Sequence, residues 1–230
     1  MAKKSALLTK KQIPELIALL NDMYPEAECE LAYGNIFQLL TAVVLSAQTT
    51  DKSVNKVTPV LFARFPDAQA MNRALEADEE ATVEEIAQII KTIGMYKTKS
   101  KNVAALSRKL CMLYDGRVPD TYEELIALPG VGRKTANVVL SVGFGQQRIA
   151  VDTHVFRVAN RIGIVHEKDV LKTELALMDV LPEESWARMH HNLIFHGRYC
   201  CDARKPKCAA CTLYVLCKWE EKSKFKEATE

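Results

Sequence analysis

A short glycine-containing turn between two helical patterns is the feature that most constrains how this chain can fold. The turn runs from Leu128 to Gly132 and reads Leu-Pro-Gly-Val-Gly. Gly130 and Gly132 remove side chains where the backbone must turn sharply or approach another group closely. Helical periodicity resumes at once in the apolar residues between Ala136 and Leu140. The turn therefore predicts a hairpin between two helices.

The start of the second helix predicts an anion site with a lysine beside it. Free backbone N–H groups point outward there, and the helix macrodipole adds partial positive charge, so a phosphate can bind. Lys134 lies in the first helical turn, where a cation opposes the dipole. We hypothesise that this field, with some burial, favours the neutral amine and makes Lys134 a nucleophile. The alternative is a lysine that only contacts phosphate.

Helical periodicity continues along most of the chain, with no alternating strand pattern of useful length, so we expect an all-α fold. Helices are expected over Lys11 to Met23, Asn35 to Gln48, Asp51 to Phe65, Thr82 to Ile93, Lys97 to Leu113, Pro119 to Leu128, Arg133 to Val142, Asp152 to Ile162, Val170 to Leu181 and Glu183 to Tyr199. The helix from Asn35 is apolar nearly all round and is placed in the core. The expected caps are Asp51, Thr82 with Glu85, Asp120 with Glu123, and Asp152.

Composition narrows the class of protein. A chain of 230 residues with 48% hydrophobic and 26% charged residues fits one large soluble domain or two small ones. No apolar run is long enough to span a bilayer, and the first residues lead into no long apolar segment, so we expect a cytosolic protein.

Charge is distributed unevenly, although the net charge of +2 is too small to indicate nucleic acid by itself. The segment 91–109 holds six basic residues and no acid, and 130–150 holds three basic residues and no acid. Six acids crowd into 76–85. Such separation suits a chain that lays one face on a polyanion, and chance clustering on a solvated surface is the alternative.

Seven cysteines fall into two groups. Cys29 and Cys111 lie in expected helical surroundings and are interpreted as small buried hydrophobic residues. The other five lie near the C-terminus, where Cys201, Cys208, Cys211 and Cys217 have the spacing C-x6-C-x2-C-x5-C and Cys200 precedes them. Four thiols so close together indicate a metal site rather than disulfides. Zinc and an iron–sulfur cluster both remain open, and either Cys200 or Cys201 could be the first ligand.

Three basic residues, Arg204, Lys205 and Lys207, lie between the first two of these thiols. A bound metal could hold this basic loop in place for contact with phosphate. The alternative is a structural metal site with incidental surface charges.

These motifs together resemble the endonuclease III family, the bifunctional DNA glycosylases of the helix-hairpin-helix superfamily. The resemblance rests on the hairpin with Lys134, on VDTHVFR at 151–157 and on the cysteine spacing, and it extends back to LLTAVVLSAQTTD at 39–51. It implies two all-α lobes. One is a six-helix lobe over residues 29–146, and the other joins 1–28 to 147–230 and carries the cluster. Lys134 and Asp152 would face each other across the cleft.

The resemblance also implies a reaction. Lys134 looks like the catalytic lysine, which attacks C1′ of a damaged nucleotide, expels the base and forms a Schiff base. Asp152 looks like the aspartate that helps to activate the lysine and stabilises positive charge on the sugar. β-Elimination then cuts the strand 3′ to the lesion. The expected substrates are oxidised pyrimidines such as thymine glycol, and abasic sites, in double-stranded DNA.

The remaining site residues follow from the same resemblance. Cys201, Cys208, Cys211 and Cys217 match the ligands of a [4Fe–4S] cluster, which leaves Cys200 as a spectator. Gln48 and Met95 match the residues that fill the gap left by a flipped nucleotide, although Met95 stands where the family pattern has leucine. The expected DNA contacts are Gly130, Gly132, Arg133, Arg204, Lys205 and Lys207.

Two other functions are compatible with parts of this pattern. One is an adenine-specific mismatch glycosylase, which shares the hairpin and cluster but usually lacks the lysine and has an extra C-terminal domain. The other is a non-catalytic DNA-binding protein that uses an iron–sulfur cluster as a redox sensor. The expected protein is a cytoplasmic monomer with no membrane association, and it is nucleoid-associated if bacterial.

Overall fold

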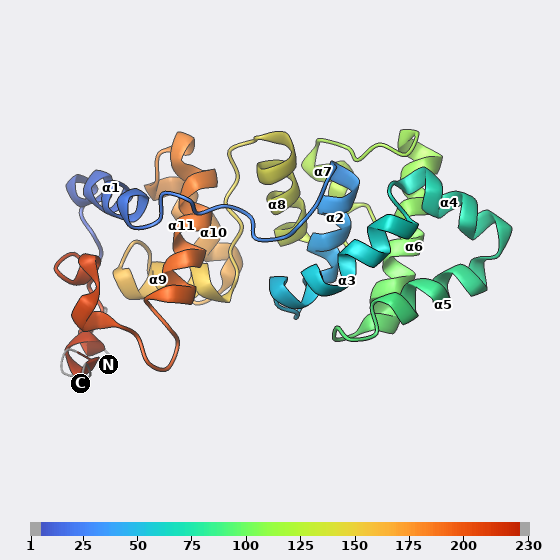
Figure 1. The fold of residues 1–230 in the computed structure, drawn as a ribbon. Coiled ribbons are helices and arrows are strands. Elements are labelled where there is room, and N and C mark those ends of the chain that lie inside the picture. The colour runs from blue at the N-terminus through green and yellow to red at the C-terminus, as the bar shows by residue number, and fades with distance from the viewer. Residues whose placement is uncertain (1–5, 226–230) are drawn as a thin grey trace. The chain divides into compact units, whose positions relative to one another are not determined.

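The computed structural model describes residues 6–225, which form helices and connecting segments with no strand, as expected for an all-α fold (Figure 1). The chain divides into two compact units, Glu30–Gly145 and the pair Met1–Cys29 with Gln146–Glu230. Within the described residues, every helix is too short or too polar to cross a lipid bilayer.

The unit Glu30–Gly145 is built around one buried helix. Its helices are α2 (Ile36–Leu45), α3 (Asp51–Arg64), α4 (Ala68–Ala77), α5 (Glu79–Ile89), α6 (Tyr96–Tyr114), α7 (Tyr122–Ile126) and α8 (Arg133–Phe144). Helix α2 contacts α3, α6 and α8 (Figure 1). Its residues from Phe37 to Leu45, except Gln38, are buried. The prediction of a core helix here is confirmed, although the helix ends before Gln48.

The second unit consists of helices from both ends of the chain. They are η1 (Lys10–Gln12), α1 (Ile13–Met23), α9 (Thr153–Ile162), α10 (Val170–Val180), η2 (Glu183–Ser185) and α11 (Trp186–Tyr199), followed by the short η3 (Cys208–Ala210), η4 (Thr212–Tyr214) and η5 (Glu220–Phe225). Helix α11 contacts both α1 and α9. Leu16, Leu20, Val155, Leu177 and Leu193 share one buried apolar cluster.

The predicted hairpin is present as α7, a turn and α8. Gly130 has φ +76°, and a Cβ at this position would lie 3.0 Å from Cβ of Asn102 on α6. Leu128 and Val131 on either side of it are buried. The hairpin is therefore fixed against α6 by a backbone conformation and a close approach that only glycine provides without strain.

Three predicted helix caps are wrong. Helix α3 is capped by Thr50, whose side chain accepts from the backbone N–H of Ser53, rather than by Asp51. Helix α7 is capped in the same way by Thr121 rather than by Asp120. Helix α5 begins at Glu79 after the cap Asp78, and not at Thr82.

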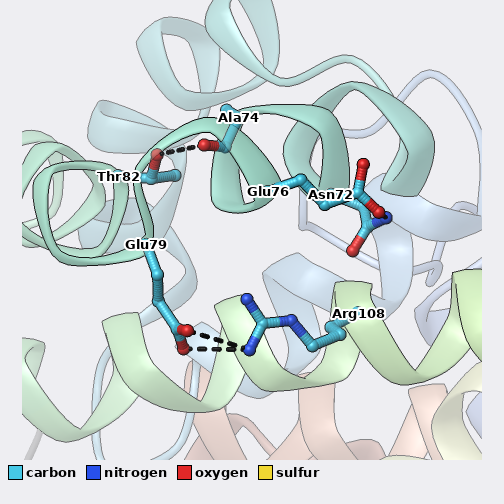
Figure 2. Close-up of polar contacts among 6 residues, drawn as sticks. All are labelled: Asn72, Ala74, Glu76, Glu79, Thr82 and Arg108. Carbon is cyan, nitrogen blue, oxygen red and sulfur yellow. Dashed lines mark hydrogen bonds and ion pairs between the residues drawn. The ribbon is translucent and has the colours of Figure 1, made fainter.

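Thr82 contacts a helix that was not predicted from the sequence. Helix α4 precedes α5, and the Thr82 hydroxyl donates to the backbone oxygen of Ala74 on α4 at 3.0 Å (Figure 2). Thr82 is 5% exposed, so this bond satisfies a buried hydroxyl. The residue joins two helices instead of starting one.

The expected separation of acidic and basic segments is only partly present. The acidic helix α5 packs against the basic helix α6, and Arg108 donates to both carboxylate oxygens of Glu79 at 3.0 Å (Figure 2). Lys109 donates to the backbone oxygen of Ala127 at 2.6 Å. These two cations stabilise contacts within the protein, and the stretch 91–109 does not form one free basic face.

The hairpin gives a stability prediction. Gly130→Ala should lower the free energy of unfolding by about 1 to 3 kcal/mol, because the new Cβ meets Asn102 and the backbone stays left-handed. Gly132→Ala is the matched control, since Gly132 has φ −100° and no described atom lies within 4 Å of a Cβ built there. Urea unfolding followed by circular dichroism measures both variants. Equal losses at the two positions would contradict this account of the turn.

Candidate functional site

Lys134 is the second residue of α8, directly after the hairpin. The cap residue Gly132 has no side chain, and no described atom lies within 4 Å of a Cβ built there, so no side chain covers the backbone at this position. The Lys134 side chain is exposed. The partial burial that the sequence analysis expected for this amine is therefore absent. What the structure provides is an accessible amine at the positive end of a helix dipole.

Arg133 precedes Lys134 and is held on the outside of the hairpin. Its Nη1 donates to the hydroxyl of Tyr122 at 3.2 Å, and its guanidinium lies 5.5 Å from the centre of that ring. Since Tyr122 begins α7, this contact joins the first residues of the two hairpin helices.

Asp152 caps α9, as predicted. Its Oδ1 accepts from the backbone N–H groups of His154 and Val155, both at 2.8 Å. The side chain is half-buried. Both capping bonds use the same oxygen, so the cap fixes the carboxylate while Oδ2 takes no part in it. Such a carboxylate can stabilise a cation or accept a proton without leaving its cap.

Two arginines on α9 bind backbone carbonyls of the cysteine-containing loop and of the end of α11. Arg157 donates to the backbone oxygens of Gly197 and Cys201 at 2.8 and 3.1 Å. Arg161, one helical turn later, donates to the backbone oxygens of Asp202 and Ala203 at 2.7 and 2.8 Å. The sequence analysis missed both residues. Their spacing of four residues on one helix face was the available signal, but backbone acceptors leave no signature in sequence.

The basic residues of this loop point to solvent. Arg204, Lys205 and Lys207 are exposed. The Oδ1 atom of Asp202 accepts from the backbone N–H groups of Arg204 and Lys205 at 2.8 and 3.1 Å, which forms a local turn. The loop conformation therefore depends on protein contacts as well as on any metal, which the sequence analysis did not anticipate.

The five C-terminal cysteines line one cavity together with His196. Cys201 and Cys208 are buried, and the other three are partly exposed. Side-chain donor atoms of His196, Cys200 and Cys211 all lie within 4.8 Å of one another. The structure thus places Cys200, the expected spectator, beside an expected ligand. A set of four or five thiols around one cavity fits a thiolate-bound metal centre, and the structure does not select which four would bind it.

The chemistry of these thiols is set by burial and by one another. Burial is the main cause that raises the pKa of Cys201, Cys208 and Cys217. The pKa of Cys211 is raised to about 12, first by its hydrogen bond with Cys200 and then by burial. A metal would have to bind these sulfurs as thiolates, so its binding releases protons.

The other two cysteines differ from the prediction. Cys29 lies in a connecting segment outside any helix, while Cys111 lies in α6. Both are partly exposed, so neither is a fully buried hydrophobic residue.

Gln48 and Met95 lie in turns next to helix ends, as expected, and both have an unusual backbone. Their φ values are +53° and +59°, in the left-handed region that non-glycine residues rarely adopt. Gln48 is exposed, and Met95 is 55% exposed. Exposed side chains on strained turns are common where a protein contacts a ligand.

A family model described as HhH-GPD superfamily base excision DNA repair protein matches residues 41–183. The endonuclease III of Bacillus subtilis (strain 168) is 48% identical over 217 residues, which cover 94% of this chain and 96% of that relative. The endonuclease III of Escherichia coli (strain K12) is 45% identical over 215 residues, which cover 94% and 99%.

The fold of the chain is also similar to that of solved structures. A trapped covalent intermediate of endonuclease III with DNA has a TM-score of 0.86 and 46% identity, over 95% of this chain and 99% of that chain. A thermostable thymine-DNA glycosylase has a TM-score of 0.78 at 24% identity, over 92% and 98% of the two chains, and this likeness shows a common fold alone.

Proposed function

The chain belongs to the endonuclease III family of DNA glycosylase/AP lyases, within the HhH-GPD superfamily of base excision DNA repair proteins, and from this premise we propose how its residues act. The proposed substrates are oxidised pyrimidines and abasic sites in double-stranded DNA. The observation that carries the proposal is the exposed Lys134 two residues after the bare backbone of Gly132. A phosphate bound at that helix start would bring the deoxyribose of the same strand within reach of the amine.

Lys134 is proposed as the nucleophile. Its unprotonated Nζ attacks C1′, the bond from C1′ to the base breaks, and the base departs with the bonding electrons and takes up a proton. Opening of the sugar ring gives a protonated imine between Nζ and C1′. Loss of a proton from C2′ then expels the 3′ phosphate, which cuts the strand by β-elimination.

Asp152 is proposed as the carboxylate that accompanies this reaction. Its Oδ1 is occupied by two backbone N–H groups, so its position is fixed before substrate binds. A fixed negative charge stabilises the cation that develops on the sugar, and the carboxylate can accept the proton that Nζ loses.

The reacting sugar lies inside a duplex, so the damaged nucleotide must be flipped out and the vacated space filled. We propose that Gln48 and Met95 fill it. The supporting observation is that both side chains are exposed on left-handed turns. Contacts to phosphate are proposed for the backbone of Gly130 and Gly132, for Arg133 and for the exposed cations Arg204, Lys205 and Lys207.

We propose that the cysteine cavity holds a [4Fe–4S] cluster through Cys201, Cys208, Cys211 and Cys217. When bound, such a cluster would supply structural cross-linking of the loop and redox chemistry. Arg161 would support it directly, because its Nη1 lies 3.6 Å from the sulfur of Cys201. Neither alternative function, the adenine-specific glycosylase or the redox-sensing binder, is favoured by the family comparisons.

Trapping with borohydride tests the nucleophile. The wild-type protein should form a covalent adduct with duplex DNA that contains an abasic site, because borohydride reduces the imine to a stable amine. Lys134→Ala should lower trapping by at least ~100-fold while binding to a non-cleavable abasic analogue persists. Lys172→Ala is the control, an exposed lysine that pairs with Asp169. Efficient trapping by Lys134→Ala would show that another amine reacts.

Two substitutions separate capping from catalysis at Asp152. Asp152→Asn keeps an oxygen that can cap α9, so its stability should stay within about 0.5 kcal/mol of wild type. Its removal of thymine glycol should nevertheless fall by about 10² to 10⁴-fold, because the charge is lost. Asp152→Ala should also lose about 1 kcal/mol of stability. Single-turnover kinetics and urea unfolding measure the two effects, and full activity in Asp152→Asn would exclude the proposed role.

Substitutions of the adjacent residues Cys200 and Cys201 form a matched pair that tests which cysteine is the first ligand of the cluster. Cys201→Ser should reduce bound iron and the visible absorbance of the purified protein, whereas Cys200→Ser should keep about four irons per chain. Iron analysis and absorbance spectra of proteins purified without oxygen measure this. Loss of iron from Cys200→Ser with retention in Cys201→Ser would reverse the assignment of the first ligand.

A further inference from the structure

Lys99 is a buried lysine with an unusual partner. It lies on α6, its residue is 3% exposed, and burial lowers the pKa of its amine. Its Nζ donates to the hydroxyl of Thr49 at 2.8 Å. Among the described residues no carboxylate pairs with this amine, and the neutral hydroxyl of Thr49 is its hydrogen-bond partner. An ammonium group that is buried without a carboxylate partner lowers the stability of the fold, which points to a role other than folding alone.

The two ends of Lys99 reach two different turns. Its backbone N–H donates to the carbonyl of Met95 at 3.0 Å, one helical turn earlier. Its side chain ends at Thr49, the residue after Gln48. The Thr49 hydroxyl in turn lies 3.4 Å from the carbonyl of Ala47, the residue before Gln48. Lys99 therefore connects the start of α6 directly to Thr49 on one side of Gln48, and through the Thr49 hydroxyl to Ala47 on the other.

The two turns are also close in space and strained. A Cβ built at Gly94 would lie 4.0 Å from the carbonyl oxygen of Gln48 and from the hydroxyl of Thr49. Gln48 and Met95 are two of the three non-glycine residues with positive φ in the described chain. A left-handed turn at such residues persists only where the surrounding contacts maintain it.

We propose that Lys99 is a positioning residue that fixes the spacing of the Gln48 and Met95 turns, so that both side chains enter the duplex together beside a flipped nucleotide. This inference rests on the insertion roles proposed above for these two residues. Filling one gap from two turns requires them to be arranged before binding, since ordering them on contact with DNA would use up binding energy.

Removing the hydrogen bond between Lys99 and Thr49 should weaken the preference for damaged DNA. Lys99→Met keeps the aliphatic stem and removes the donor, and Thr49→Val keeps the shape and removes the acceptor. Each should lower the preference for a duplex with a non-cleavable abasic site over the intact duplex by about tenfold, the size expected for one hydrogen bond to a charged group. Affinity for the intact duplex should be unchanged, because phosphate contacts dominate it. The double variant should lose no more than the larger single loss.

The same variants can be followed by a second signal. A 2-aminopurine base opposite the abasic analogue reports by its fluorescence whether side chains enter the stack. Wild-type protein and Thr49→Ser, which keeps the hydroxyl, should give the same change in fluorescence. Lys99→Met and Thr49→Val should give a smaller change at saturating protein.

Lys101→Met is the matched control, because Lys101 is an exposed lysine on the same helix. It should leave the preference for the abasic duplex unchanged. If Lys99→Met weakens binding to both duplexes equally, Lys99 is an ordinary phosphate contact and the proposal is wrong. It is also wrong if Lys99→Met and Thr49→Val lower thermal stability but keep the preference and the fluorescence change.

Gln48→Ala and Met95→Ala distinguish a failure of this inference from a failure of the proposed function. If these two variants lower the preference for the abasic duplex but Lys99→Met and Thr49→Val do not, only the role of Lys99 is refuted. If all four variants keep the preference, the insertion roles of Gln48 and Met95 are refuted as well. If Lys99→Met does not fold, Thr49→Val alone decides, since the substituted side chain is partly exposed.

Discussion

The bare backbone at the start of α8 is the constraint on which the rest of the account depends. Gly130 adopts a left-handed conformation against Asn102 of α6, and Gly132 starts the helix with no side chain over it. Leu128 and Val131 are buried on either side. A helix start that is both accessible and fixed to the core can bind a phosphate without first ordering itself. Lys134, the second residue of α8, is positioned by this fixed hairpin.

Helix α9 organises the other unit by polar contacts. Its first turn is capped by Asp152, and its later turns place Arg157 and Arg161 against backbone carbonyls of the cysteine-containing loop. Arg161 also stacks over Trp219 at 4.1 Å from the ring centre. One helix thus positions the proposed catalytic carboxylate at one end and the cysteine-containing loop at the other.

The features that could be predicted best from the sequence are those that depend on a local pattern of residues. The core helix α2, the hairpin and the cap at Asp152 follow from apolar periodicity, glycine placement and one well-placed acid. Caps were predicted poorly where two polar residues compete. Thr50 and Thr121 cap α3 and α7 in place of the adjacent acids, and Asp78 displaces Thr82, which packs against the unpredicted helix α4. For Thr82 the deciding contact is with another helix, which sequence pattern does not record, and at α3 and α7 the helix boundary falls one residue from the predicted position.

The residues of the candidate site also divide into those that a local pattern indicates and those that depend on contacts distant in sequence. Lys134, Asp152 and the C-terminal cysteines could be proposed from the sequence, because residue type and spacing carry the resemblance to the family. Lys99 and the arginines of α9 could not, because their partners are a hydroxyl and backbone carbonyls that any sequence could supply. The exposure of Lys134 was also mispredicted, since burial depends on neighbours far away in sequence.

The central claim is that one particular amine forms the bond to the sugar. Peptide mapping by mass spectrometry of the borohydride-reduced protein–DNA adduct tests it most directly, because it identifies the modified residue in the unaltered protein. The account predicts that the sugar remnant is found on Lys134 alone. A remnant on Lys99, or on any other amine in place of Lys134, would contradict it.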